Sequence, residues 1–235
     1  MLLHNRLLGT RRSGEFVTLF LCHFDGTNGD PGPFLDEVPG ITWTDDMDQG
    51  TATFTTTSKF GPTAMSVPPV ISLTHTVMCG QFTHLNGKTW TVEGWVRLTA
   101  GANNTVVFFG VGNHAEDIAQ ATMYLRANLD LSVCDVVLST FATGPIETST
   151  AFVLTSGQYY HAAFSYDEPN GNYEVRFNGI REIISAQASI IGDDTDFMLT
   201  HTIDTAPVIF DEWRGVLGLP YTGTTYAVPT TAFTV

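Results

Sequence analysis

The sequence is poor in charged residues, and basic residues are the scarcest. Only 14% of its 235 residues are charged, and 10 Lys and Arg stand against 24 Asp and Glu, so the formal net charge is −14. A nucleic-acid-binding protein needs a basic face for the phosphate backbone, so this balance argues against that class. Thr, Ser, Asn and Gly replace many charges, which is typical of a β protein with polar but uncharged outer faces.

Cysteine is also scarce. The three cysteines, Cys22, Cys79 and Cys134, are far apart and form no C-x-x-C pair. An odd number of widely spaced cysteines argues against a disulfide framework and favours buried free thiols. Such thiols are typical of a protein that is assembled in a reducing compartment.

Long apolar runs and helical periodicity are missing. No window approaches the ~20 apolar residues that span a membrane. The first eight residues are interrupted by His4 and Arg6, which does not fit a signal peptide. No long segment repeats with the period of an α-helix, so the sequence favours neither a helical bundle nor a membrane helix.

Period-two alternation is the strongest positive signal. Every second residue is apolar in 162–166 and again in 173–177, which predicts strands with one buried face. Asn170-Gly171 and Asn178-Gly179 supply turns, because Asn and Gly tolerate positive φ. This meander is the strongest hairpin signal in the chain.

About a dozen short strands of this kind predict an all-β, antiparallel two-sheet jelly roll that forms one domain over residues 15–235. In the strand over 89–98, Val92 and Val96 share one face, while Glu93 and Arg97 share the other. One short helical turn is predicted over 114–120. The predicted strands cover residues 15–24, 51–57, 65–78, 89–98, 106–111, 123–125, 131–138, 151–154, 161–166, 173–177, 183–191 and 208–216, and the tail over 219–235 is predicted to be extended.

The first 14 residues differ from the rest. They hold Arg6, Arg11 and Arg12 and no acid, so they carry +3, while the remainder carries 7 − 24 = −17. One interpretation is a frayed terminus. The other is a basic arm that binds an acidic partner or a neighbouring copy of the chain.

Five segments, in order, resemble LamG-like jelly-roll domains of the concanavalin A-like class that occur in bacteriophage structural proteins. The resemblance implies two sheets packed face to face, with the strands nearest the two termini adjacent. It does not include residues 1–14, and no motif matches within 99–156. The segments are LFLCHFDGTNG (19–29), SKFGPTAM (58–65), TWTVEGWVRL (89–98), GQYYHAAFSYD with GNYEVRFNGIRE (157–182) and IFDEWRGVLGLPYTGTTYAVPTTAF (209–233).

The resemblance also implies a possible structural calcium ion between the first and last strands. Asp25 and Asp211 match acidic positions of the family, and Asp30 lies close to Asp25 in the sequence. Calcium takes six to eight oxygen ligands, typically carboxylates and backbone carbonyls. The alternative is that Asp25 caps the following turn and Asp211 binds Arg214. No other cofactor is predicted.

Enzymatic chemistry finds little support. Hydrolases with a concanavalin A-like fold use a strand with Glu-x-Asp-x-x-Glu, where two carboxylates act as nucleophile and acid/base. No Glu in this chain has Asp two residues later, and Glu174 beside Arg176 looks like an exposed polar face. There is also no G-x-S-x-G, P-loop, zinc spacing or dinucleotide fingerprint. The sequence therefore predicts a protein that is not an enzyme.

Three histidines are candidates for other roles. His114 stands near Glu116 and Asp117, where it would either ligate a metal or simply be solvated. His23 and His161 lie in predicted strand regions, which favours structural hydrogen bonds.

Aromatic residues are candidates for a sugar platform, because rings stack on the apolar faces of sugars. Trp43, Tyr159, Tyr160 and Tyr221 are the candidates, and an exposed aromatic with Asn or Asp beside it would favour sugar binding. The core is expected to hold Trp90, Trp95, Trp213 and most of the Phe residues.

From these features we predict a non-enzymatic phage virion protein, a capsid decoration (cement) protein that binds the major capsid protein or other virion proteins through its arm and sandwich. It is expected to assemble in the host cytoplasm as an oligomer, most plausibly a trimer, because capsids offer threefold sites. The alternative is a carbohydrate-binding host-adhesion module of a phage tail or fibre, with a surface glycan as its ligand.

Overall fold

In the computed structural model, the arm predicted over residues 1–14, with Arg6, Arg11 and Arg12, lies outside the described residues, and so does His114. The structure describes residues 16–39, 41–47, 51–68, 75–79, 82–83, 85, 87–99, 105–113, 118–128, 130–140, 144–186, 194–202 and 207–235.

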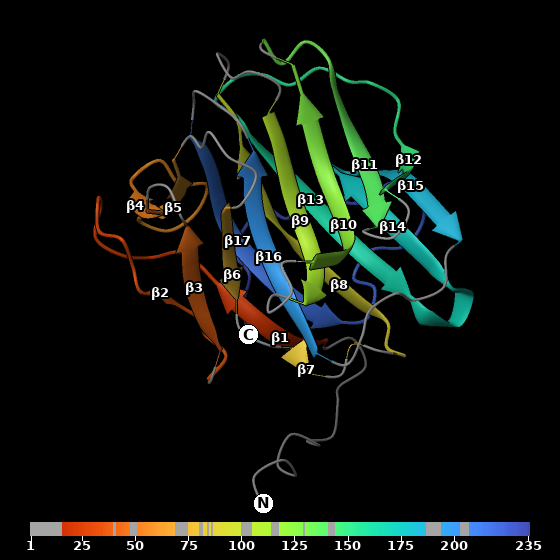
Figure 1. The fold of residues 1–235 in the computed structure, drawn as a ribbon, viewed down its shortest axis with the longest axis horizontal. Coiled ribbons are helices and arrows are strands. Elements are labelled where there is room, and N and C mark those ends of the chain that lie inside the picture. The colour runs from red at the N-terminus through yellow and green to blue at the C-terminus, as the bar shows by residue number, and fades with distance from the viewer. Residues whose placement is uncertain are drawn as a thin grey trace, which may run out of the picture.

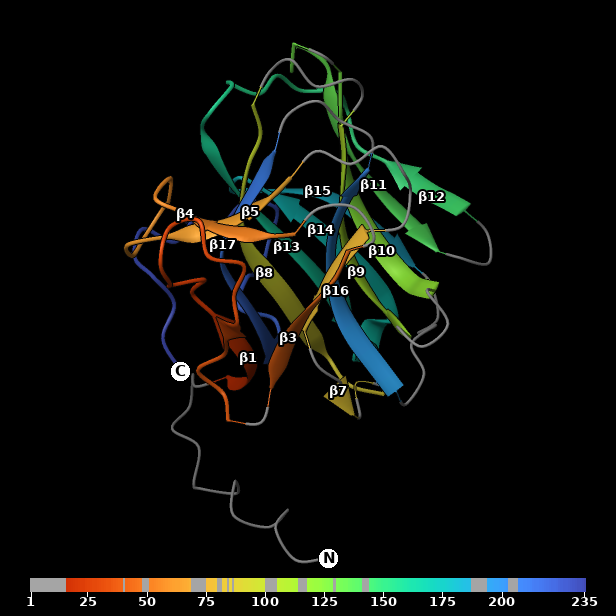
Figure 2. The same cartoon turned by 60° about the vertical axis from the view of Figure 1, so that its left-hand side comes forward.

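Two antiparallel sheets pack face to face, which confirms the predicted jelly-roll sandwich (Figure 1, Figure 2). The first sheet has the strand order β15-β14-β13-β8-β17-β5-β4, with β1 also paired to β17. Its strands are β1 (Val17–Cys22), β4 (Thr53–Thr55), β5 (Ala64–Val67), β8 (Trp90–Arg97), β13 (Tyr159–Asp167), β14 (Asn172–Phe177), β15 (Ile180–Ala186) and β17 (Val208–Leu217).

The second sheet has the order β12-β11-β10-β9-β16-β6-β3-β2, with β7 also paired to β16. Among the described residues there is no α-helix, and in particular none long and apolar enough to cross a membrane. The strands of the second sheet are β2 (Phe34–Leu35), β3 (Thr42–Met47), β6 (His75–Cys79), β7 (Phe82–Thr83), β9 (Thr105–Asn113), β10 (Ile118–Ala127), β11 (Cys134–Thr140), β12 (Gly144–Thr148) and β16 (Asp194–Thr202).

The central meander forms as predicted, because its turn residues adopt the backbone angles that the turns require. A 3₁₀ turn over Glu168–Asn170 ends at Gly171 with φ +61°, and β13 then pairs with β14. Asn178 and Gly179 have φ values of +44° and +94°, which join β14 to β15 in a tight hairpin.

Strand β8 alternates between the two faces as predicted. Val92 and Val96 are buried in the hydrophobic core between the sheets, and Glu93 belongs to the opposite, outer face. Gly94 occupies an inward position where a Cβ atom would lie 2.3 Å from the Trp213 ring. Only glycine lets that indole lie flat on β8, so the sequence of β8 fixes how β17 packs beside it.

Strand β17, near the C-terminal end of the described chain, pairs with strand β1 near the N-terminal end. It pairs with β8 along one edge, and along the other edge first with β5 and then with β1. The register shifts between Asp211 and Arg214, where Glu212 has φ +52°. This bulge lies where the partner of β17 changes from β5 to β1. The pairing of β17 with β1 confirms that strands from near the two termini are adjacent.

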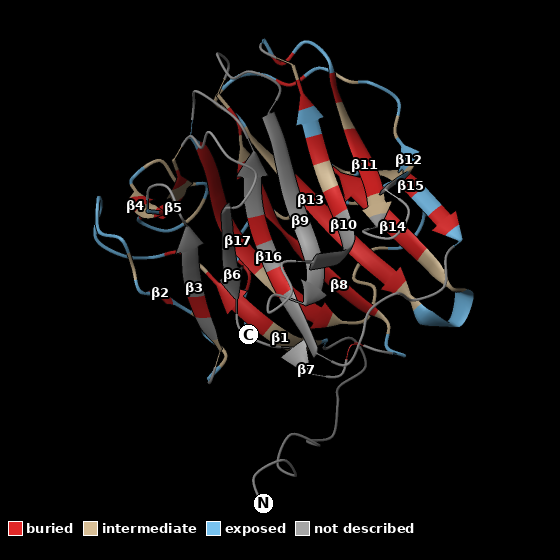
Figure 3. Ribbon diagram, viewed as in Figure 1, coloured by how far each residue is buried: buried red, intermediate tan, exposed pale blue. Residues whose placement is uncertain are grey.

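Burial follows the sandwich (Figure 3). Phe20 stacks on Phe197 across the core at 5.0 Å, and Trp43 meets Phe197 edge-on at 6.1 Å. Trp90 and Trp213 are buried as predicted. The helical turn predicted over 114–120 is wrong in its described part, because 118–120 begin strand β10.

Candidate functional site

The C-terminal tail, residues 219–235, covers part of the outer face of the first sheet, the face turned away from the second sheet. Tyr226 N–H donates to Gly179 O at 2.9 Å, and Arg181 N–H donates to Thr224 O at 2.9 Å. Further along, the Phe233 ring lies over the Arg214 guanidinium at 4.0 Å. The tail is extended, as predicted, but it also shields the side chains beneath it.

Beneath the tail, Glu93 is the centre of a polar cluster and is fully buried. Arg214 Nε and Nη2 lie 2.8 and 2.7 Å from its Oε1. Oε2 accepts from Tyr221 OH at 2.5 Å and lies 3.1 Å from His161 Nε2. Burial by itself would raise the pKa of Glu93, but His161, Arg214 and Tyr221 outweigh it and lower the pKa below its ordinary value.

His161 connects this cluster to the tail a second time. Its Nδ1 lies 2.8 Å from Tyr226 OH, and the imidazole is fully buried. The predicted structural role of His161 is therefore confirmed. Burial raises the pKa of both Tyr221 and Tyr226, so both phenols stay protonated and can donate.

A second buried pair lies on β14. Arg176 Nη2 donates to Glu174 Oε2 at 2.5 Å, and Arg176 Nη1 donates to Gly223 O of the tail at 3.0 Å. Glu174 is 6% exposed and Arg176 is 1% exposed. The prediction that this pair forms an ordinary exposed face is wrong, because the tail crosses β14 and removes both groups from water.

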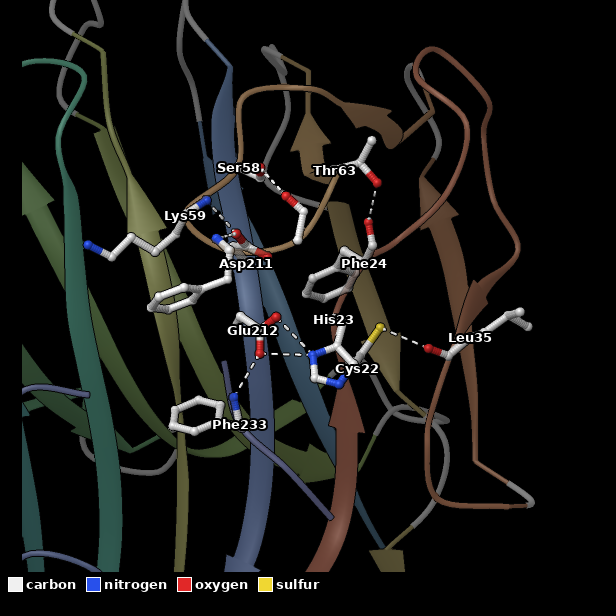
Figure 4. Close-up of polar contacts among 12 residues, drawn as sticks. Cys22, His23, Phe24, Leu35, Ser58, Lys59, Thr63, Asp211, Glu212 and Phe233 are labelled. Atoms are coloured by element: carbon white, nitrogen blue, oxygen red, sulfur yellow. Dashed lines mark hydrogen bonds and ion pairs between the residues drawn. The ribbon is translucent and has the colours of Figure 1, made fainter. Parts of the chain in front are cut away.

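The bulge in β17 positions two acids, which Figure 4 shows together. Asp211 Oδ2 accepts from the backbone N–H groups of Lys59 and Phe60 at 2.6 and 3.0 Å. Asp211 Oδ1 is buried without a partner in the described chain. Burial raises the pKa of Asp211 to about 7, although those two hydrogen bonds oppose the shift.

Glu212 lies beside Asp211 and holds the end of β1. Its Oε1 and Oε2 lie 2.8 and 2.9 Å from His23 Nδ1, and Oε2 also accepts from Phe233 N–H at 3.0 Å. The hydrogen bond that His23 donates to the Glu212 carboxylate raises the pKa of His23. The predicted structural hydrogen bond of His23 is confirmed, and it ties β1 to β17 and the tail.

The three aspartates of the predicted calcium site do not form a group of side chains arranged to hold a metal in the described chain. Asp25 receives a hydrogen bond from the Thr63 backbone, while Asp211 binds the loop after β4 rather than Arg214. Asp30 is exposed in a turn, with its N–H on Thr27 O. In the described ranges no group of three His, Cys, Asp or Glu side chains is arranged to hold a metal. The predicted calcium site, which also depends on nearby backbone carbonyls, stays a prediction.

The four aromatic candidates do not form one platform. Trp43 is 3% exposed, and its indole Nε1 donates to Asp36 at 2.9 Å, so its prediction as a sugar-binding residue is wrong. Tyr159 OH donates to Thr57 O at 2.7 Å. Tyr160 stacks on Phe177 at 5.7 Å. Tyr159, its neighbour on β13, belongs to the opposite face of the strand.

Tyr221, the fourth aromatic candidate, points inward to Glu93, as described above. Trp95 is buried as predicted, yet on the outer face, where Lys59 Nζ lies 4.5 Å from its ring centroid. Cys22 and Cys134 are buried free thiols, as the sequence predicts.

One polar group of the second sheet was not predicted. Arg126 Nε and Nη2 on β10 donate to Asp135 Oδ1 and Oδ2 on β11 at 3.0 and 2.7 Å. The Arg126 side chain is 51% exposed. Tyr124, two residues earlier, is half-buried on the same face. These residues lie in 99–156, where no motif matched; the alternation of Tyr124 and Arg126 with apolar residues was the available signal.

Comparison with known proteins identifies the fold of this chain but no protein family. No protein-family model matches the chain, and no curated protein matches it in sequence. Solved structures do match. The basic winged bean lectin with Tn-antigen superposes with a TM-score of 0.56 at 9% identity, covering 88% of this chain and 100% of the lectin.

Two bacterial structures are similar in the same way. Domain 4 of AbnA, an extracellular arabinanase from Geobacillus stearothermophilus in complex with arabinotriose, gives a TM-score of 0.53 at 19% identity, covering 88% of this chain and 96% of the domain. The carbohydrate-binding module CBM66 from Bacillus subtilis gives a TM-score of 0.50 at 11% identity, covering 74% of this chain and 94% of the module. The chain therefore has the jelly-roll fold of lectins and carbohydrate-binding modules.

Proposed function

We propose that this protein binds carbohydrate without transforming it. The observation that supports the proposal most is the fold, which is shared along most of the chain with a plant lectin, a carbohydrate-binding module and an arabinanase domain crystallised with arabinotriose. A fold alone does not determine a function. The proposal therefore also rests on which surfaces of this sandwich remain open.

The outer face of β8, β13 and β14 in the first sheet is largely covered. The cover comes from the tail and from the loop that contains Lys59 and Phe60. The acids beneath, such as Glu93 and Glu174, are buried and paired with cations. A carboxylate pair that acts on a glycoside must reach the substrate. The arrangement therefore supports binding rather than hydrolysis.

A glycan array tests the proposal directly. The purified chain is expected to bind a subset of neutral glycans, and heat-denatured protein serves as the control. Incubation of a bound oligosaccharide with excess protein should release no new reducing ends. Folded protein that binds none of the glycans would overturn the proposal, and new reducing ends would overturn its non-enzymatic part.

The finer prediction, a decoration protein on a phage capsid, remains a prediction. The arm on which it depends lies outside the described residues, and the comparisons give it no support. Cryo-electron microscopy of a virion with this chain located in the map would test it. Many copies over the capsid lattice would support decoration, whereas copies only on a tail or fibre would favour host adhesion through a glycan.

A further inference from the structure

The two sheets end in the strands β2, β4, β12 and β15, and the first three of these edges are protected (Figure 1). An open edge presents unpaired N–H and C=O groups that can pair with another chain. Strand β2 has only two residues. Strand β4 is covered, because Phe54 N–H donates to Asp30 O at 3.0 Å and Gly29 N–H donates to Phe54 O at 2.8 Å. On β12, Pro145 lacks an N–H, Glu147 is exposed and the register with β11 shifts.

Strand β15 lacks such protection along its second half. The tail pairs with its first half, where Arg181 N–H donates to Thr224 O at 2.9 Å. The register shift against β14 also lies at that end, before Ile183. Within the described chain, nothing pairs with residues 182–186 on the edge that faces away from β14. This stretch, EIISA, has one charged residue and no proline.

The side chains and charges around this stretch suit contact with another protein surface. Ile183 lies in the hydrophobic core, so Ile184 belongs to the outer face, where it is 44% exposed. The charged residues of β14 and β15 cancel, although the whole chain carries −14. They are Glu174, Arg176, Arg181 and Glu182. An acidic copy of the chain therefore meets a locally neutral edge here.

A second copy of the same stretch is complementary to it. Opposite residues of an antiparallel pair direct their N–H and C=O groups alike, so a two-fold axis must pass between a residue and its own copy. The midpoint of residues 182–186 is Ile184. Centring the pair there places Ile184 against its copy, with the two Cβ atoms about 4.5–5.5 Å apart. It also places Glu182 opposite Ala186 of the second copy, so that the two Glu182 carboxylates stay apart.

We propose that two copies of this chain associate through β15, which pairs with itself in antiparallel register about Ile184 and joins the two first sheets into one. Such an interface uses the same surface on both copies and closes at two, so it gives a dimer and not the trimer predicted from the sequence. The proposal does not depend on the proposed carbohydrate binding.

Sedimentation equilibrium of the full chain tests the proposal at about 0.15 M salt, which screens the repulsion between two acidic copies. Wild type should form a dimer. Ile184→Lys should weaken the dimer at least about tenfold, because two like charges would be directly opposite each other. Within one copy the new amine lies beside Glu174, so the fold should persist, which melting temperatures check. The matched control is Thr148→Lys, at an exposed position of the protected edge β12, which should dimerise as wild type does.

Disulfide cross-linking tests the register. Under mild oxidation Ile184→Cys should form a covalent dimer, because the two positions are opposite each other. Glu182→Cys should not, because four residues along a strand separate the two thiols by about 13 Å. Wild type, in which Cys22 and Cys134 are buried free thiols, is the control for cross-linking through native cysteines.

Three results would overturn the proposal. A wild type that stays monomeric at every concentration would exclude a second copy and leave an extended segment of another protein as the partner that the edge fits. A trimer would be incompatible with a two-fold contact. A dimer that is as tight in folded Ile184→Lys as in wild type would place the contact elsewhere. Cross-linking of Glu182→Cys without cross-linking of Ile184→Cys would overturn the register.

Discussion

At the scale of single residues, Glu93 is the acid whose removal should matter most. It is a fully buried carboxylate that balances the charge of Arg214 and also lies 3.1 Å from His161 Nε2. Removing one member of a buried charged group leaves its partners uncompensated, which usually costs more than the group itself contributes to stability.

We therefore expect Glu93→Gln to lower the free energy of unfolding by about 3–5 kcal/mol. Urea denaturation measures the loss. The exposed Glu168→Gln is the control and should stay within about 0.5 kcal/mol of wild type. A loss below about 1 kcal/mol for Glu93→Gln would contradict the view that its charge is needed.

Asp211 should make stability depend on pH. Its pKa is about 7 in the folded state, above its ordinary value of 3.8. The folded state then holds a proton that the unfolded state has released, so this contribution is complete below about pH 4 and is lost as the pH rises through 7. The melting temperature of Asp211→Asn should fall less than that of wild type between pH 5 and 8.

His23 has a raised pKa and acts in the same direction. The comparison of wild type with Asp211→Asn isolates the contribution of Asp211, because His23 is present in both. Parallel curves for the two proteins would show that Asp211 does not titrate in this range.

At the scale of elements, strand β8 and the tail each depend on contacts that arrive from far along the chain. Gly94 on β8 accommodates the Trp213 ring of β17. The tail covers β8, β13 and β14 through Tyr221 and Tyr226, whose hydroxyls bind Glu93 and His161.

Gly94→Ala should destabilise the fold by about 1–3 kcal/mol, because the added methyl group displaces the indole. Thermal and urea unfolding measure the cost. In a Trp213→Leu background the same substitution should cost less, since the clashing ring is gone. Equal costs in both backgrounds would show that the strain arises elsewhere.

Tyr221→Phe combined with Tyr226→Phe should lower the free energy of unfolding by about 2–5 kcal/mol. The rings still pack, but two buried acceptors lose their donors, at about 1–3 kcal/mol each. Exposed Thr230→Ala in the same tail is the control. Limited proteolysis should also release the tail earlier in the double variant, and unchanged cleavage would argue against its anchoring role.

Strands and hairpins could be predicted from the sequence because their signals are local. The alternation of Val92 with Glu93 and the Asn178-Gly179 turn each depend only on neighbouring residues. Burial of Glu174 was missed because it depends on the tail, which returns from nearly fifty residues later to bind Arg176 at Gly223. Trp43 was misplaced because nothing near it in sequence reports the Phe197 ring that packs against it.

At the scale of the whole molecule, the described chain presents no three-carboxylate metal site. We expect chelator treatment and added Ca²⁺ to leave the melting temperature unchanged, with Mg²⁺ as the control for ionic strength. A rise of several degrees with Ca²⁺ alone would contradict this and would revive the calcium hypothesis for Asp25 and Asp211.

The position of β17 also constrains the order in which the protein can form during synthesis. This strand lies inside the first sheet, between β8 on one side and β5 and β1 on the other. A ribosome releases β1 long before β17, so β1 must wait without this partner while the intervening strands emerge. Pairings across such a sequence separation are slow, and their unpaired edges favour aggregation. The nascent chain therefore exposes the unpaired edges of β1 until β17 has emerged.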